Sequence, residues 1–137
     1  MLQQSSLQIL TAGRSLIEIT EKVNAAIAGK GGENGLVQLF LQHTSASLIL
    51  SENADPTVLV DLESILSRLA PDGDSVYQHN YEGDDDMAAH VRSVLTTNDI
   101  SIPFKNGKLQ LGTWQGVFLW EHRYQPHHRS IIVSLIQ

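Results

Sequence analysis

The sequence of 137 residues contains no cysteine, and it has no apolar run long enough to span a bilayer. The missing cysteines exclude disulfides and thiolate metal ligands, and such a composition is typical of a cytosolic protein, so we expect a cytoplasmic location. The first ten residues, MLQQSSLQIL, lack the basic region and the uninterrupted apolar core of a signal peptide. We therefore expect a protein without a membrane partner.

Positive charge is also scarce. Nine Lys and Arg residues stand against fifteen Asp and Glu residues, which gives a formal net charge of −6. Binding the phosphate backbone of a nucleic acid needs clustered positive charge, and no basic tract is present. We therefore expect a small-molecule substrate and no nucleic-acid partner.

A length of 137 residues predicts a single domain over residues 1–137. Strands are expected at 5–12, 14–20, 36–43, 47–50, 112–124 and 130–136, with a hairpin at 101–111 around Asn106-Gly107. Helices are expected at 21–29, capped by Thr20, at 56–70, and after Gly83. This order favours an α+β fold with mostly antiparallel sheets and about three helices. The strands at 112–124 and 130–136 are apolar on both faces, so we expect part of their surface to pack against another subunit.

The two later helices have clear start signals. Asp55 is suited to the N-cap position and Pro56 to the first helical position. Asp84, Asp85 and Asp86 follow Gly83, where negative charge favours a helix start. The residues expected to face the core are Val58, Leu62, Ile65 and Leu69 in the first helix, and Met87, Val91, Val94 and Leu95 in the second.

The stretch YQHNYEGDDDMAAH (77–90) holds the densest group of polar side chains. Asp86 lies one helical turn before His90, and His79 precedes them in the loop, so the three could form a metal or acid–base site. A structural interpretation stays open, because a histidine bordering an apolar helix face is often only packed there, and an Asp run before a helix is often a cap. The spacing matches no standard zinc signature.

Further polar residues lie at the ends or on the faces of apolar elements, namely His43, Ser45, Asn53, Asp55, Gln115 and Glu121. Glu121 shares a strand face with Val117 and Leu119, where a carboxylate is uncommon unless it is paired or belongs to a site. The alternative is an ion pair with Arg123 or Arg129 where the strand leaves the core. His127 and His128 are expected to be exposed turn residues.

Three ordered motifs resemble those of the YjbQ-like family of small bacterial and archaeal proteins, and they are HTSASLILSENADPTVLVDLE (43–63), YQHNYEGDDDMAAHVRSVL (77–95) and IPFKNGKLQLGTWQGVFLWEHR (102–123). The resemblance covers nearly all of the chain from about Leu36 onward. It implies an α+β fold that forms a homotrimer with sheets packed around the three-fold axis. It also implies a site that includes His43, His79 and His90. One departure is Asp86, where family members often have Asn.

Some members of this family are labelled secondary thiamine-phosphate synthase. The resemblance therefore implies a metal-dependent enzyme acting on a small phosphorylated metabolite, with this transferase activity as the most specific form. We expect a divalent metal on His43, His79 and His90, either zinc or another transition metal, with magnesium as the alternative that suits three histidines less because it prefers oxygen ligands. Glu121 and His43 are the expected catalytic residues, and the expected substrate-binding residues are Ser45, Asn53, Asp55 and Gln115.

Two other functions remain open from the sequence. The first is a metal-activated hydrolase, in which the same cluster lowers the pKa of a bound water. The second is a non-catalytic trimeric protein whose histidines hold a metal or another ligand.

Overall fold

The computed structural model describes residues 1–137, and it contains eight strands and three helices. In chain order these are β1 (Leu2–Leu10), β2 (Ser15–Glu18), α1 (Thr20–Ile27), β3 (Asn34–Leu41), β4 (Ala46–Glu52), α2 (Pro56–Leu69), α3 (Asp84–Leu95), β5 (Asp99–Lys105), β6 (Lys108–Leu109), β7 (Gln115–Glu121) and β8 (His128–Ile136). One sheet has the strand order β1-β8-β3-β5-β6 and the other β2-β7-β4, and all pairs are antiparallel. The α+β expectation is confirmed.

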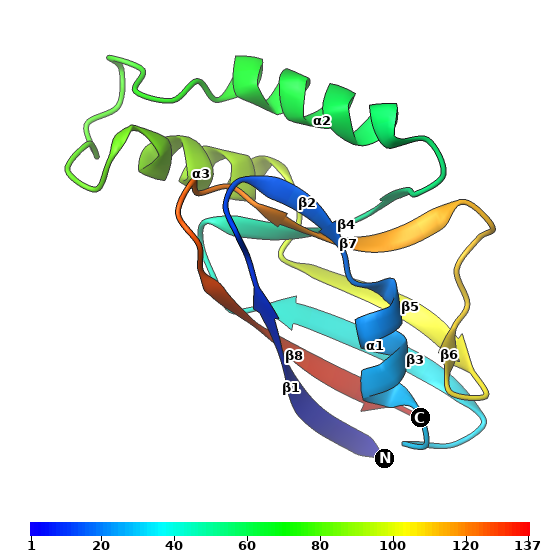
Figure 1. Ribbon diagram of the computed structural model, residues 1–137. Helices are drawn as coiled ribbons and strands as arrows, with labels where there is room; N and C mark the ends of the chain where they lie inside the picture. Colours follow the sequence, from blue (N-terminus) through cyan, green and yellow to red (C-terminus); the bar gives the residue numbers. More distant parts are fainter.

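The main core lies between the five-stranded sheet on one side and the three-stranded sheet with α1 on the other. Figure 1 shows α2 and α3 on the far side of the three-stranded sheet, so the chain forms successive layers. Val23 and Ile27 of α1 are fully buried against this core, where they close the part of the five-stranded sheet that the smaller sheet leaves open.

Strand β7 is covered on both faces by its own chain. Val117 and Leu119 point into the main core. Trp120, on the opposite face, donates from Nε1 to Glu63 of α2 at 3.2 Å. The expectation that this strand leaves apolar surface for another subunit is therefore wrong for β7, because it is the middle strand of a sheet that lies between two layers.

The outer face of the five-stranded sheet is not covered in the chain. Leu2, Ile136 and Leu36 are aligned in one row across β1, β8 and β3, and Ile132 is aligned with Phe40 in another. Phe40 is 45% exposed. A row of amide and hydroxyl side chains separates the two apolar rows, since Ser134 is aligned with Gln4 and Gln38.

Helix α2 begins as predicted, with the Asp55 side chain accepting a hydrogen bond from the backbone N–H of Thr57 at 2.9 Å. Its buried residue is Leu66, whereas Ile65 and Leu69 of the predicted core stripe are exposed. The helix begins outside the main core and lies over the smaller sheet and α3, so it buries little of its apolar side.

The predicted core stripe of α3 is wrong for its second half, whereas Met87 and Val91 of its first half are partly buried. Val94 is 84% exposed and Leu95 is also exposed. The helix instead packs through Ala88, Ala89 and Ser93, whose Oγ donates to the carbonyl oxygen of Ala46 on β4 at 3.1 Å. Small side chains let the helix approach the sheet closely, and Val94 and Leu95 lie on its outer side.

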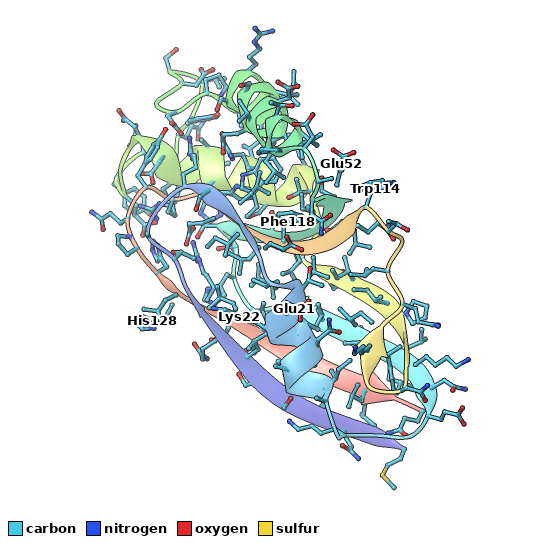
Figure 2. The ribbon with its side chains drawn as sticks, turned by 45° about the vertical axis from the view of Figure 1, so that its right-hand side comes forward. Glu21, Lys22, Glu52, Trp114, Phe118 and His128 are labelled. Carbon is cyan, nitrogen blue, oxygen red and sulfur yellow. The ribbon has the colours of Figure 1, made fainter.

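The hairpin turn at Asn106-Gly107 is confirmed, with positive φ at both residues. Several boundaries differ from the prediction. Thr20 begins α1 instead of capping it, and its Oγ1 accepts from the N–H of Val117. Strand β8 begins at His128, so this residue is part of a strand, where it is exposed (Figure 2). No helix is long and apolar enough to cross a membrane.

Candidate metal site

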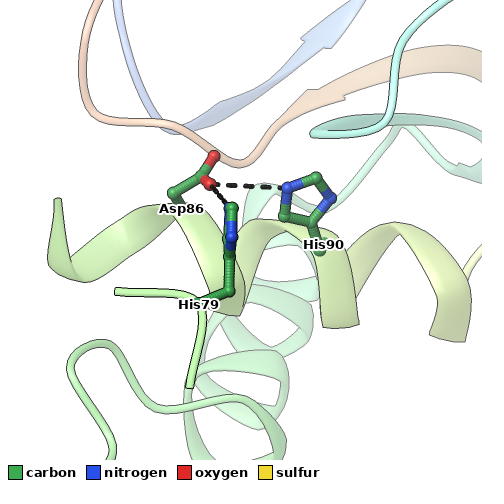
Figure 3. Close-up of side chains that lie close together, drawn as sticks. All are labelled: His79, Asp86 and His90. Atoms are coloured by element: carbon green, nitrogen blue, oxygen red, sulfur yellow. Dashed lines mark hydrogen bonds and ion pairs between the residues drawn. The ribbon is translucent and has the colours of Figure 1, made fainter. Parts of the chain in front are cut away.

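Three side chains of the 77–90 stretch converge. The Oδ2 atom of Asp86 lies 2.8 Å from Nε2 of His79 and 3.4 Å from Nε2 of His90 (Figure 3). One ligand atom from each residue lies within 4.8 Å of the other two. Such a spacing allows one cation to contact all three with small side-chain rotations.

The local sequence explains how these residues meet. Asp86 and His90 are four residues apart on α3, so they lie on the same face one turn apart. Gly83 precedes the helix with φ of 101°, a conformation that L-residues rarely adopt, and this turns the chain into α3. The carbonyl oxygen of Asp84 accepts a hydrogen bond from the N–H of Gly73 at 2.9 Å, which holds the 73–83 loop, and with it His79, against the start of α3.

The cluster has one buried and two accessible members. The side chain of Asp86 is 4% exposed, whereas those of His79 and His90 are 32% and 33% exposed. The two imidazole rings meet edge to face at 5.4 Å between centroids, and the Tyr81 ring also meets that of His79 edge to face, at 4.8 Å. The anionic ligand is therefore held by the protein while the histidines face solvent.

Asp86 remains ionised despite its burial. Burial alone would raise the pKa of Asp86, but its contacts with Glu82 and His79 and the charge of Arg123 hold it below its usual value. A deprotonated carboxylate is the form that binds a metal ion.

A cavity of about 270 Å³ lies beside the cluster. His79 belongs to both, and the other lining residues are Gly73, Asp74, Ser75, Tyr77, Asn80, Gly83, Asp84 and Met87. The lining contains two carboxylates and no Lys or Arg, so it favours groups that donate hydrogen bonds over free anions.

His43, the third predicted ligand, is not in this cluster within one chain. Its Nε2 atom accepts a hydrogen bond from the backbone N–H of Ser130 at 2.8 Å, and its Nδ1 atom lies 3.3 Å from Nη1 of Arg129. Burial and the charge of Arg129 lower the pKa of His43. Asp86, and not the predicted His43, is the third member of the cluster beside His79 and His90.

Glu121 is fully buried and uses both carboxylate oxygens. Oε1 accepts from Thr11 Oγ1 at 2.7 Å and from Arg129 Nε at 2.8 Å, while Oε2 accepts from Arg129 Nη2 and from the N–H of Arg123 at 3.1 Å. Burial alone would raise the pKa of Glu121, but these hydrogen bonds and the Arg129 charge hold it low. The contacts match the ion-pair alternative from the sequence.

The four expected substrate-binding residues do not form one group. Ser45 Oγ accepts from Arg129, and Gln115 Oε1 accepts from the N–H of Gly112. Asn53 and Asp55 do line a common cavity of about 320 Å³ between β2 and the start of α2. Asn53 already donates to Glu18, and Asp55 caps α2.

Sequence reasoning missed a fully buried polar network centred on His122. His122 Nδ1 accepts from Arg92 Nε at 3.0 Å, so its proton lies on Nε2, which donates to Ser47 Oγ at 2.7 Å. Burial and the charge of Arg92 lower the pKa of His122 to about 2. The sequence offered one signal for this network, which is that His122 lies on the same face of the predicted strand as Phe118 and Trp120.

Comparison with known proteins gives a consistent result over the whole chain. The family model described as "UPF0047 protein YjbQ-like" matches residues 5–137. A UPF0047 protein of Synechocystis is 52% identical over 96% of this chain and 90% of its own length. The UPF0047 protein YjbQ of Salmonella typhimurium is 41% identical over 98% of both chains.

Solved structures agree. A conserved hypothetical protein of Thermus thermophilus superposes with a TM-score of 0.87 at 39% identity, covering 96% of this chain and 99% of its own. A YjbQ/UPF0047 protein of Clostridium acetobutylicum gives 0.83 at 34% identity, covering 98% and 99%. The chain belongs to the YjbQ-like UPF0047 family.

Proposed function

We propose that this chain is a metal-dependent enzyme acting on a small phosphorylated metabolite, with a divalent transition metal held by His79, Asp86 and His90. The observation that supports this most strongly is the convergence of their three ligand atoms within 4.8 Å. The 3.4 Å between Asp86 Oδ2 and His90 Nε2 matches the separation of about 3.4 Å between two ligands of a tetrahedral zinc ion, and the 2.8 Å hydrogen bond from His79 to the same oxygen would open slightly to admit the cation.

The donor set fits zinc or another transition metal better than magnesium. Imidazole nitrogens suit zinc, copper, iron and nickel, whereas magnesium prefers oxygen ligands. Three protein ligands leave a coordination position open, as catalytic zinc sites do, and the partial exposure of both histidines gives access to it. When bound, such a cation would acidify water and polarise a phosphoryl oxygen.

The histidines and the cavity offer two neighbouring surfaces, which would bind different parts of the substrate. Asp74 and Asp84 repel a free phosphate, so we expect the phosphoryl group to lie at the histidines instead of deep in the cavity. Ser75 and Asn80 offer hydrogen bonds to the remainder of the molecule. His79 borders both surfaces and would orient the substrate between them.

Thiamine-phosphate synthase is the most specific form of this proposal, and it rests on the resemblance to labelled family members. The reaction joins a pyrimidine pyrophosphate to a thiazole phosphate and releases pyrophosphate, so charge must be neutralised at the leaving group. A phosphate-ester hydrolase would use the same residues. The two are distinguished by whether pyrophosphate or inorganic phosphate is released.

The test joins metal content to turnover. Protein purified without chelator, together with His79→Ala, His90→Ala and the exposed control His128→Ala, is analysed for bound metal. Each is then assayed for pyrophosphate release from the pyrimidine and thiazole pair, and for phosphate release from a panel of phosphate esters. We expect the two site variants alone to lose both metal and turnover. An unaltered protein that binds metal without turnover, and whose site variants lose their assembly, would instead support the non-catalytic alternative.

The outer face of the five-stranded sheet supports a second part of the proposal, which is a homotrimer. Its rows of Leu2, Ile136 and Leu36 and of Ile132 and Phe40 form an apolar surface of the kind that marks subunit contacts, with Asp99 of β5 aligned with Phe40 at its edge. The number three comes from the family resemblance. A cytoplasmic location is proposed on the absence of cysteine.

A further inference from the structure

Arg123 donates a hydrogen bond to Asp86 of the candidate metal site. It follows β7 by two residues and donates three hydrogen bonds to the segment that starts α3. Its Nη1 atom donates to Oδ1 of Asp86 at 2.8 Å, its Nε atom to Oδ2 of Asp85 at 2.9 Å, and its Nη2 atom to the carbonyl oxygen of Glu82 at 3.0 Å. A single guanidinium therefore holds Glu82, Asp85 and Asp86 of this segment together.

The two oxygens of Asp86 are divided between different partners. Oδ1 accepts from Arg123, whereas Oδ2 faces His79 and His90. A planar guanidinium with two separate carboxylate partners has little freedom to rotate, and the Arg123 side chain is only 19% exposed. The rotation of the Asp86 carboxylate is therefore set by Arg123, and only one oxygen remains for a cation.

We propose that Arg123 is a positioning residue of the metal site, which holds Asp86 as a one-oxygen ligand through Oδ2. This inference rests on the proposed metal site. Partners that hold a ligating side chain in this way typically contribute 10- to 100-fold to metal affinity. Holding one oxygen back also excludes the two-oxygen carboxylate binding that calcium often uses.

A purely structural role for Arg123 is the competing explanation, because the same hydrogen bonds attach the start of α3 to the end of β7. The visible absorption of bound Co²⁺ separates the two, since it reports the number and geometry of the ligands. A lost structural contact lowers stability without altering that spectrum, whereas a freed Asp86 carboxylate alters it.

The experiment titrates Co²⁺ and Zn²⁺ into metal-free full-length protein and into Arg123→Gln, Arg123→Lys and the charge-matched control Arg68→Gln, which lies on the exposed side of α2. Thermal unfolding of each variant is recorded alongside. We expect about a 10- to 100-fold loss of affinity and a changed Co²⁺ spectrum in Arg123→Gln, with no change in the control. Lysine keeps the charge but cannot hold both carboxylates, so we expect only partial recovery.

The outcomes are distinguishable. Metal binding with unchanged affinity and spectrum in Arg123→Gln overturns this inference and leaves the proposed function in place. Full recovery by lysine also overturns it, since charge alone would then suffice. Absence of saturable binding in the unaltered protein overturns both. If the glutamine variant does not fold, the lysine variant decides the question through its spectrum.

Discussion

The Nε2 atom of His79 lies 2.8 Å from Oδ2 of Asp86, although one residue belongs to a loop and the other to the first turn of α3. His90 approaches the same oxygen from one turn further along the helix. Asp86 is thus the central member of the cluster, and it is also its buried one.

Replacing that carboxylate tests its role in metal binding. Asp86→Asn keeps the size and shape of the side chain but removes its charge, so we expect the affinity for Zn²⁺ to fall at least about 10-fold. Calorimetric titration measures this, with Asp61→Asn, an exposed residue on α2, as the control. Equal affinities for both variants would show that Asp86 is not a ligand.

The ion pair of Glu121 and Arg129 predicts a large loss of stability on removal of one charge. Glu121→Gln leaves a buried guanidinium without its counter-charge, so we expect the free energy of unfolding to fall by about 3–5 kcal/mol. Urea unfolding measures this. The exposed Glu52→Gln (Figure 2) should cost less than about 0.5 kcal/mol. A Glu121→Gln cost as small as that of the control would mean that the buried pair contributes little.

His122 predicts a loss of stability in mild acid. Its pKa is about 2 in the folded chain, against about 6.5 when unfolded. Below pH 6.5 the unfolded state therefore binds a proton that the folded state does not, and this weakens the fold by about 2 kcal/mol at pH 5. The contribution is constant above pH 6.5 and is lost as the pH falls, and His43, whose pKa is also lowered, adds to it.

Urea unfolding at several pH values between 5 and 8 checks this. His122→Asn keeps an acceptor for Arg92 but does not titrate. Its unfolding below pH 6.5 should therefore take up about one proton fewer than that of the unaltered protein, so its stability should fall less steeply with falling pH. An identical pH dependence of the two proteins would contradict the assignment of a neutral, buried imidazole.

Gly35 predicts a steric limit where β3 meets the end of β8. An added Cβ would lie 2.2 Å from the carbonyl oxygen of Ile136 and 2.9 Å from the Phe104 ring. Because a paired strand backbone cannot move away easily, we expect Gly35→Ala to cost about 3 kcal/mol. Gly29→Ala meets no atom within 4 Å and pays only for its positive φ, about 1–2 kcal/mol. Thermal unfolding compares the two, and the reverse order would contradict this packing.

The outer sheet face predicts self-association that a charge disrupts. Phe40→Asp removes a large apolar side chain from this face and adds a second carboxylate beside that of Asp99, so we expect the assembly to dissociate to single chains of 15.1 kDa. Val94→Asp introduces the same charge at an exposed position of α3 and should leave the assembly intact. Sedimentation equilibrium measures both, and an unaltered protein that is already a single chain would contradict the proposal.

Local signals in the sequence predicted the elements well. Asp55 with Pro56 marked the start of α2, and Asn106-Gly107 marked the hairpin, because each signal depends only on neighbouring backbone geometry. The apolar stripes of α2 and α3 were predicted less well. Periodicity assumes that large residues face the core, whereas α3 approaches the sheet through small ones.

The site was predicted in part for a similar reason. Asp86 and His90 are one helical turn apart, and His79 is close in sequence, so local spacing brings them together. The position of His43 depends on the pairing of β3 with β8, which places it beside Ser130. The contacts of Arg123 with the start of α3 depend on where β7 ends relative to that helix. Such long-range relations have no signature in the local pattern.

The most direct test of the metal site is the amount of metal that binds to the unaltered protein compared with the amount that binds to His79→Ala. Metal-free protein is dialysed against Zn²⁺ and then analysed for bound metal. We predict one tightly held ion per chain in the unaltered protein and in His128→Ala, and none in His79→Ala. An unaltered protein without bound metal, or a His79→Ala variant with a full complement, would contradict the proposed metal site.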